Sequence, residues 1–312
     1  MTLTQIEYIV AVEKHGSFVT AAENCFVTQP TLSMQIQKLE EELGLKIFDR
    51  NHHPIIATKL GKKIIEQSKL VLFEKKKIDE LLLDDRNELS GHLNIGVIPT
   101  VASSIIPNTL RSFAQKFPNL IISIQEMTTQ RIVDKLKEDE IDFGIASTPL
   151  GEKSLKETKL YQEPFIVFAH EKNPLLKKKL INPKELDVNQ MWSLSDEHCM
   201  KNQVMHLCGK QKVQGSKTPL NYLSGSVMSL INMVRINGGF TIIPILFEKD
   251  FSGFLKNNTI AFEEPVPCRQ ISMLTNKYFT KNKIANAFKA SILEFIPKEM
   301  LAEDAKRKIM PI

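Results

Sequence analysis

The sequence lacks the long apolar segments and the leader expected of a membrane or exported protein. None of its apolar runs approaches the ~18–20 residues that span a bilayer. The first residues, MTLTQIEYIVAVEKHG, are interrupted by Glu7 and Glu13 and have neither a basic start nor a small-residue cleavage site. We therefore expect a cytoplasmic protein that has no membrane partner.

Cysteine is scarce. The 312 residues contain four, Cys25, Cys199, Cys208 and Cys268. Four cysteines in a chain of this size do not form a disulfide framework, and cytoplasmic thiols are normally reduced. A bridge in this protein is therefore expected to be transient and regulatory.

Familiar catalytic and cofactor motifs are missing as well. The sequence contains no CxxC dithiol, no Walker phosphate loop, no GxSxG elbow and no His/Cys/Asp/Glu cluster at metal-ligand spacing. Each of these motifs carries a defined chemistry, so their absence argues against the corresponding enzyme classes. We predict a protein that is not an enzyme and that needs neither a cofactor nor a metal.

Positive charge is concentrated in one part of the chain. The formal net charge is +5, and the stretch from Lys46 to Lys77 contains nine basic residues but three acidic ones. Such a stretch indicates a polyanionic partner, although a solvated lysine-rich surface explains the charge equally well.

The first sixty residues predict three short helices. An amphipathic segment ends at Gly16, Ser17 can cap the helix FVTAAENC, and Thr28 can cap a third helix whose first turn tolerates Pro30. The third helix ends at Gly44 and carries an inward apolar stripe formed by Leu32, Ile36, Leu39 and Leu43.

The other face of the third helix is polar. It carries Gln29, Thr31, Ser33, Met34, Gln35 and Lys38. Gln, Ser and Thr side chains can pair with base edges in the major groove, whereas Lys38 can contact a phosphate. A short helix, a tight turn and such a helix are typical of a helix-turn-helix, although a plain three-helix bundle remains open on the residues alone.

A family resemblance favours DNA. The run FVTAAENCFVTQPTLSMQIQKLEEELGLKIFDR resembles the N-terminal winged helix-turn-helix of LysR-type transcriptional regulators. The resemblance implies binding to double-stranded promoter DNA, with the wing NHHPIIAT along the backbone or minor groove. The implied DNA-binding residues are Ser17, Thr28, Gln29, Pro30, Thr31, Ser33, Gln35, Lys38 and Arg50.

Residues 59–89 predict one long helix. About thirty helical residues span ~45 Å, and a helix of that length needs a partner to cover its apolar side. That side is formed by Leu60, Ile64, Val71, Ile78 and Leu82. A second copy of the chain is the simplest cover, and in LysR-type regulators this helix pairs two subunits, which implies a homodimer or homotetramer. Packing onto the chain's own C-terminal part is the alternative.

From residue 92 onward, short apolar strands alternate with helices. This rhythm predicts an α/β fold with an open parallel sheet, in which ligands bind beyond the carboxyl ends of strands. Thr100 and Thr129 follow the first two strands and are candidate ligand-binding residues, with helix capping as the alternative reading. The expected strands are LNIGVI, LIISIQ, IDFGIA, FIVFAH, MWSLS, FTIIP and ISMLT.

The resemblance to LysR-type regulators implies that this part is a two-lobed, periplasmic-binding-protein-like (Rossmann-type) regulatory domain. The expected division is a winged helix-turn-helix over 1–58, a linker helix over 59–89 and a regulatory domain over 90–312, with lobe one about 91–161 plus 268–300 and lobe two about 162–267.

The segment SDEHCMKNQVMHLC holds two of the cysteines. Cys199 is expected at a helix N-terminus, where the helix dipole favours a thiolate; His198 and Lys201 add positive charge, which Asp196 and Glu197 oppose. In one continuous helix, Cys199 and Cys208 lie ~14 Å apart along the axis and point to opposite faces. A disulfide needs Cα atoms within about 7 Å, so the helix must open before the two sulfurs can bond.

The same segment resembles the switch segment of the peroxide-sensing LysR-type regulators. The resemblance implies that Cys199 reacts with hydrogen peroxide and then forms a reversible disulfide with Cys208, which thiol reductants such as glutaredoxin or thioredoxin reset. It also implies a regulator, mainly an activator, of oxidative-stress genes that acts with RNA polymerase. The implied peroxide pocket consists of Thr100, Thr129, His198 and Lys201.

This sequence departs from those regulators at three places. They commonly have arginine where Lys201 stands, and some carry histidine where Thr218 or Gln125 stands. Two other functions stay open on the residues alone: a LysR-type regulator driven by a bound metabolite, with cysteines that play no redox role, and a thiol peroxidase. The helix-turn-helix argues against the peroxidase.

Overall fold

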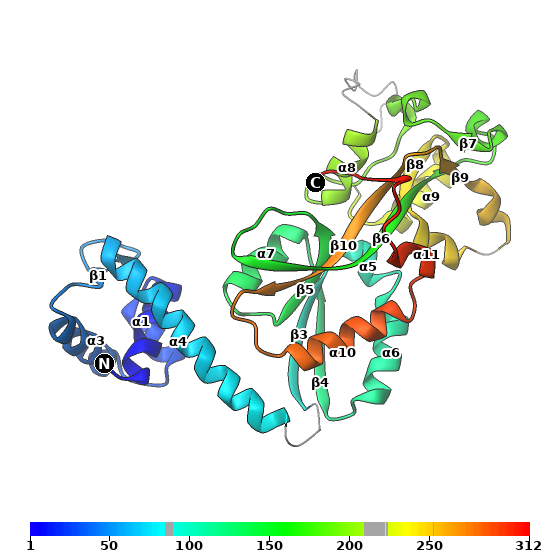
Figure 1. Cartoon of the computed structure of the whole chain (residues 1–312). Helices are drawn as coiled ribbons and strands as arrows, with labels where there is room; N and C mark the ends of the chain where they lie inside the picture. Colours follow the sequence, from blue (N-terminus) through cyan, green and yellow to red (C-terminus); the bar gives the residue numbers. More distant parts are fainter. Residues whose placement is uncertain (85–89, 209–221, 223, 252) are drawn as a thin grey trace. The chain divides into compact units, whose positions relative to one another are not determined.

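The computed structural model describes residues 1–84, 90–208, 222, 224–251 and 253–312 (Figure 1). They form two compact units, one of Met1–Glu88 with Tyr278–Lys281 and one of Leu89–Lys277 with Asn282–Ile312. Within the described residues, no helix combines the length and the apolar character that a membrane span requires.

The N-terminal unit is a helix-turn-helix followed by a small hairpin and a long helix. Its elements are α1 (Leu3–His15), α2 (Phe18–Asn24), α3 (Gln29–Leu43), β1 (Phe48–Asp49), β2 (Ile56–Ala57) and α4 (Lys59–Asp84). Both predicted glycine stops are correct, since Gly16 and Gly44 cap α1 and α3 in the left-handed conformation, with φ of 61° and 67°.

The predicted N-caps are correct in position but not in every detail. Ser17 caps α2, with its hydroxyl accepting a bond from the Thr20 amide at 3.4 Å. Thr28 occupies the N-cap of α3, but its side chain caps no backbone amide and lies 2.9 Å from the Thr31 hydroxyl. The prediction that Thr28 supplies a capping oxygen was therefore wrong.

The core of this unit confirms most of the predicted stripe on α3. Leu32, Ile36 and Leu39 are fully buried against α1 and α2, where Ala21 and Ala22 allow the helices to approach closely. Leu43 is 37% exposed because α3 ends there, beyond the reach of the other helices.

Helix α4 contains 26 residues, which corresponds to about 39 Å. One side packs on α1, where Ile65 is buried and Lys69 pairs with Glu13 at 3.2 Å. Another side leaves three of the predicted apolar residues exposed, namely Leu60 (51%), Val71 (43%) and Ile78 (61%). The side chain of Leu82 and the predicted continuation over 85–89 lie outside the described residues.

The second unit is built on a curved sheet with helices around it. Its strands run in the order β4-β3-β5-β10-β6-β9-β7, with β11 beside β10 and β8 beside β6. The strands are β3 (Gly91–Val97), β4 (Leu120–Glu126), β5 (Phe143–Thr148), β6 (Leu155–Ala169), β7 (Leu180–Ile181), β8 (Phe240–Pro244), β9 (Thr259–Phe262), β10 (Val266–Asn276) and β11 (Arg307–Ile309). The α-helices are α5 (Pro99–Ala102), α6 (Ile106–Lys116), α7 (Thr129–Lys137), α8 (Cys199–Leu207), α9 (Val227–Asn237), α10 (Asn282–Leu293) and α11 (Lys298–Leu301).

The sheet is mixed, not parallel as predicted. Strands β3, β4 and β5 are parallel, but β10 runs antiparallel to β5 and to β6. The long strand β6 pairs with β10 over Leu155–Pro164 and with β8 over Phe165–Ala169, so β6 connects the two halves of the sheet (Figure 1). The alternation of strands and helices in the sequence predicted the relative direction of the neighbouring strands only. Strand β10 belongs to a distant part of the chain, so this alternation did not predict its direction.

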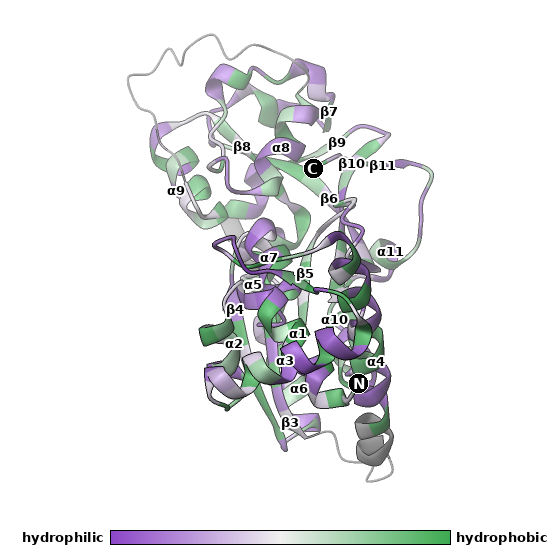
Figure 2. Ribbon diagram, turned by 90° about the vertical axis from the view of Figure 1, so that its left-hand side faces the viewer, coloured by the Kyte–Doolittle hydropathy of each residue, from purple (hydrophilic) through white to green (hydrophobic). Residues whose placement is uncertain are grey.

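The expected strand MWSLS is also absent as a strand. Met191 and Leu194 make isolated bridges to Phe240 and Ser224. An apolar cluster around β6 and β8 surrounds this segment and includes Leu194, Val204 and Cys208. In Figure 2, the ribbon around β8 is coloured largely as hydrophobic. The apolar residues of MWSLS are therefore explained by their burial in that core, and they do not form a strand.

Candidate functional site

A small cavity lies where helices α7 and α8 begin. Cys199 is the first residue of α8 and Thr129 the first of α7, so the N-terminal ends of both helices reach the cavity. Helix N-termini present free N–H groups and a partial positive charge, which favour negative charge on a nearby group. The lining residues are Ile98, Pro99, Thr100, Thr128, Thr129, Ser147, Glu197, His198, Cys199, Met200, Gln203 and Arg269.

The cavity is very small. Its free volume is about 20 Å³. A single water requires roughly 10–15 Å³ on the same scale, whereas pockets for drug-sized ligands occupy roughly 300–1,000 Å³. The site can therefore admit a molecule the size of water or hydrogen peroxide, but not a typical metabolite.

Three of the four predicted pocket residues meet here. Thr100, Thr129 and His198 line the cavity together with Cys199. The helix-capping alternative applies to the neighbouring Thr128, whose hydroxyl accepts a bond from the Arg131 amide at 3.4 Å. Thr100 and Thr129 are both buried, and both follow strands of the parallel part of the sheet.

Lys201 does not line this cavity. It lies two residues after Cys199 on α8 and pairs with Asp196, so its ammonium group is directed to that exposed carboxylate. Burial lowers the pKa of His198, against a smaller opposing effect of Glu197, so this environment disfavours a positive charge on the imidazole. Of the four predicted pocket residues, Lys201 is therefore the one that does not line this cavity.

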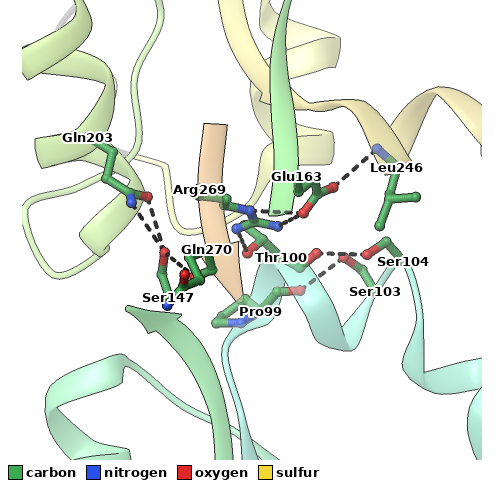
Figure 3. A network of polar contacts seen from close by, with 10 residues as sticks. All are labelled: Pro99, Thr100, Ser103, Ser104, Ser147, Glu163, Gln203, Leu246, Arg269 and Gln270. Atoms are coloured by element: carbon green, nitrogen blue, oxygen red, sulfur yellow. Dashed lines mark hydrogen bonds and ion pairs between the residues drawn. The ribbon is translucent and has the colours of Figure 1, made fainter. Parts of the chain in front are cut away.

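The cation at the cavity is Arg269, which comes from β10. Its side chain is 1% exposed, and its Nε and Nη2 donate to Glu163 Oε2 at 2.9 and 2.7 Å. Its Nη1 donates to the Thr100 hydroxyl at 2.5 Å (Figure 3). The cavity thus has a charged wall that sequence reasoning did not find, since β10 lies about seventy residues further along the chain than Cys199.

A second polar contact holds α8 in place. Gln203 lies one helical turn after Cys199 and is fully buried. Its Nε2 donates to the Ser147 hydroxyl at 3.2 Å (Figure 3). The same Nε2 donates to the Met310 carbonyl at 3.1 Å. Ser147 lies on β5, and Met310 directly follows β11. The helix that carries Cys199 is therefore tied to the first half of the sheet and to the C-terminal end of the chain.

Cys208 lies at the far end of the same helix. It is the C-cap of α8, it is 4% exposed, and burial raises the pKa of its thiol to about 11. The continuous helix over Cys199–Leu207 confirms the expected secondary structure, in which ~14 Å of helix axis separates the two sulfurs. All four cysteines carry free thiols, and burial also raises the pKa of Cys25 and brings that of Cys268 to about 12.

The lowered pKa of His198 predicts a pH effect on stability. A histidine whose folded-state pKa is depressed stabilises the fold fully above its unfolded pKa of about 6.5, and this contribution is lost as the pH falls through the folded value. We expect the drop in melting temperature between pH 7.5 and pH 5.5 to be smaller in His198→Gln than in the wild type. His206→Gln, on the exposed side of the same helix, is the matched control and should leave the drop unchanged. Equal drops in all three proteins would contradict the burial argument.

The predicted DNA-binding residues lie around α3. Gln29, Pro30, Thr31 and Lys38 are exposed, whereas Ser33 and Gln35 are half-buried. Gln35 turns toward α1, where its side-chain oxygen accepts a 3.4 Å bond from Gln5.

Arg50 connects the hairpin of β1 and β2 to helix α3, the expected recognition helix. Its Nη1 lies 3.3 Å from the Ser33 hydroxyl, its Nη2 lies 3.6 Å from buried Glu40, and its guanidinium stacks over the Phe18 ring at 4.9 Å. Glu40 also accepts the Ile47 and Phe48 amides at 2.8 and 3.3 Å, which fixes the start of the hairpin.

Two further positions discussed for the sequence are Gln125 and Thr218. Gln125 is exposed on β4, and Thr218 lies outside the described residues. In the described part of the chain, no three His, Cys, Asp or Glu side chains gather as metal ligands would.

Comparison with known proteins agrees with this architecture. Residues 3–62 match the family of bacterial regulatory helix-turn-helix proteins of lysR type, and residues 86–296 match the LysR substrate binding domain. The transcriptional dual regulator OxyR of Escherichia coli is 31% identical, over 79% of this chain and 80% of that protein. The hydrogen peroxide-inducible genes activator of Haemophilus influenzae is also 31% identical, over 79% of this chain and 81% of that protein.

Among solved structures, a full-length OxyR variant from Pseudomonas aeruginosa superposes with a TM-score of 0.69 at 28% identity. The match covers 94% of this chain and 98% of that one.

Proposed function

This chain belongs to the LysR family of transcriptional regulators and is related to OxyR, and from that premise we propose that it senses hydrogen peroxide through Cys199. The observation that carries the proposal is the cavity of about 20 Å³ in which the Cys199 thiol meets Thr100, Thr129 and His198. A site of this size suits peroxide and excludes a larger effector. The relative from Haemophilus influenzae is described as an activator of hydrogen peroxide-inducible genes, which supports the same effector.

The proposed chemistry has two balanced steps. The Cys199 thiolate attacks one oxygen of peroxide; an S–O bond forms, the O–O bond breaks, and the departing hydroxide takes up a proton to become water. Sulfur loses two electrons and peroxide gains them. The Cys208 thiolate then attacks the sulfenic sulfur, so that an S–S bond forms, the S–O bond breaks and a second water leaves.

The second step requires α8 to open. Cys208 is buried at the C-cap of that helix, and its raised pKa keeps it protonated while it stays there. Opening moves Cys208 out of the apolar core and breaks the Gln203 contacts to Ser147 and Met310. Disulfide formation is therefore coupled to refolding of the regulatory domain, and a thiol reductant such as glutaredoxin or thioredoxin would reverse it.

We propose that the protein acts while it is bound to DNA. It changes the transcription of oxidative-stress genes, mainly as an activator. The exposed residues Gln29, Pro30, Thr31 and Lys38 lie on the recognition helix, with Ser17, Thr28, Ser33, Gln35 and Arg50 supporting that surface. The exposed apolar side of α4 supports a homodimer, from which a homotetramer can be assembled. RNA polymerase is the proposed partner that responds to the change in conformation of the regulatory domain.

The test is mass spectrometry of the full-length protein treated with one equivalent of hydrogen peroxide. We expect a peptide pair linked through Cys199 and Cys208 that disappears on treatment with dithiothreitol. Stoichiometric oxidation with no such pair would overturn the proposal.

Two other functions make different predictions. If the protein is a metabolite-driven regulator, peroxide should oxidise Cys199 no more than Cys25, as measured in the same digest. A thiol peroxidase would turn over peroxide with a reductant after residues 1–58 are deleted, whereas the matched family consists of regulators.

A further inference from the structure

Arg269, which lines the Cys199 cavity, forms a buried ion pair with Glu163. Glu163 on β6 and Arg269 on β10 stand directly opposite each other in the antiparallel ladder, and they are 0% and 1% exposed. Two guanidinium N–H groups donate to one carboxylate oxygen, at 2.9 and 2.7 Å. The other oxygen of Glu163 accepts the backbone amide of Leu246 at 3.1 Å. The carboxylate is therefore fixed on both sides (Figure 3).

Stability alone is a weak reason to keep such a pair. Removing two charges from water is costly, and well-packed apolar residues often replace a buried ion pair without loss of stability. The pair does have a geometric effect, because a long arginine side chain has many rotamers and Glu163 selects one of them. In that rotamer, the remaining Nη1 reaches the Thr100 hydroxyl at 2.5 Å.

The bond to Thr100 determines what this hydroxyl can do. A threonine hydroxyl has one proton to donate and lone pairs to accept with. Because the Thr100 oxygen accepts from Arg269, its own proton is left for a second partner, and the adjacent cation makes it a stronger donor. Thr100 lines the cavity beside Cys199, so that second partner is whatever small molecule occupies the cavity.

We propose that Glu163 is a positioning residue for the reaction of Cys199 with peroxide, acting through Arg269 and Thr100. This inference rests on the proposed function. Glu163 does not line the cavity; it holds Arg269, which directs the Thr100 hydroxyl toward the peroxide oxygen that leaves as hydroxide. Such a donor stabilises developing negative charge only when it is already in place.

The test measures two reactions of Cys199 in full-length protein carrying Cys208→Ser, so that oxidation stops at the sulfenic acid. The first is the rate of sulfenic acid formation with hydrogen peroxide, followed by dimedone labelling and mass spectrometry. The second is the rate of alkylation by iodoacetamide, which needs a thiolate but releases iodide, not hydroxide. A residue with a merely structural role would change both rates, whereas a positioning residue changes the first.

We expect Glu163→Gln to slow the peroxide reaction by about 10- to 100-fold, as misplacement of a reacting group by about 1 Å does, and to change alkylation less than threefold. Glu163→Asp keeps the charge and should restore most of the peroxide rate. A wild-type peroxide rate in Glu163→Gln, or equal slowing of both reactions, would overturn the proposal.

A double variant covers the case in which unpaired Arg269 prevents Glu163→Gln from folding. Glu163→Gln combined with Arg269→Met removes both charges, and it should react with peroxide as slowly as Arg269→Met alone, because Glu163 acts only through Arg269. Additional slowing in the double variant, or a wild-type rate in Arg269→Met, would refute the mechanism. A different result would refute the proposed function itself: Cys199 in the unsubstituted pocket would react with peroxide no faster than a free cysteine.

Discussion

Cys199→Ser abolishes the peroxide-dependent change in transcription. A serine hydroxyl is not ionised near neutral pH and cannot form a sulfenic acid, so the sequence of oxidation, bridge formation and helix opening cannot begin. We expect peroxide to change expression from a target promoter in cells that make the wild-type protein. In cells that make Cys199→Ser, expression should stay at the untreated level. Quantitative PCR of the target transcript, with the protein level checked by immunoblot, measures both.

Cys268→Ala is the matched control for this experiment. Cys268 is also a free thiol of the regulatory domain, but it is buried on β10 and burial raises its pKa to about 12, so it is not expected to react. The variant should keep the full response. A response to peroxide that survives in Cys199→Ser would remove the redox reading and favour a metabolite-driven regulator.

We expect Ile78→Glu to separate the subunits of the proposed dimer and to weaken DNA binding by about 100-fold. The side chain of Ile78 is 61% exposed on the apolar side of α4, together with Leu60 and Val71. A buried, unpaired carboxylate at a helix–helix contact is strongly destabilising. Once the dimer dissociates, each DNA-reading unit binds alone, and the gain of about 10²–10⁴ from linking two binding units is lost.

The measurement pairs sedimentation velocity with fluorescence anisotropy on a duplex selected from genomic DNA by the wild-type protein. Lys76→Gln is the matched control, since it changes the charge by the same one unit and Lys76 lies ~200° around the helix from Ile78 at 100° per residue. It should stay dimeric. An Ile78→Glu protein that sediments as a dimer would show that α4 does not pair the subunits.

The sequence predicted the DNA-binding unit well because its signals are local. Gly16 and Gly44 end helices where they were expected to, and Leu32, Ile36 and Leu39 form the buried side of α3. Helix periodicity and glycine stops depend on neighbours within a few residues, so one stretch of sequence contains the whole signal. The prediction that the Thr28 side chain caps α3 was wrong because its hydroxyl contacts the Thr31 hydroxyl and not a backbone amide.

The regulatory sheet was predicted less completely because its pairing is not local. The parallel strands β3, β4 and β5 are joined by short crossovers, and their rhythm is visible in the sequence. Strand β10 pairs with β5 and β6 from more than a hundred residues away, and its direction cannot be read from any local pattern. The buried segment MWSLS was mistaken for a strand for a related reason, since a short apolar run looks the same in both settings.

The sequence by itself predicted the Cys199–Cys208 pair, through its resemblance to peroxide-sensing regulators, and the helical spacing that constrains the pair. A separation of nine positions along a predicted helix is enough to require that the helix open before Cys199 and Cys208 can form a disulfide. Only the tertiary structure decided which charge stands beside Cys199. Lys201, its neighbour in the sequence, is held by Asp196, while Arg269 reaches the cavity from β10 and is held there by Glu163. The spacing of residues along one helix is set by the chain, but the groups that meet at a cavity are set by which distant strands pair.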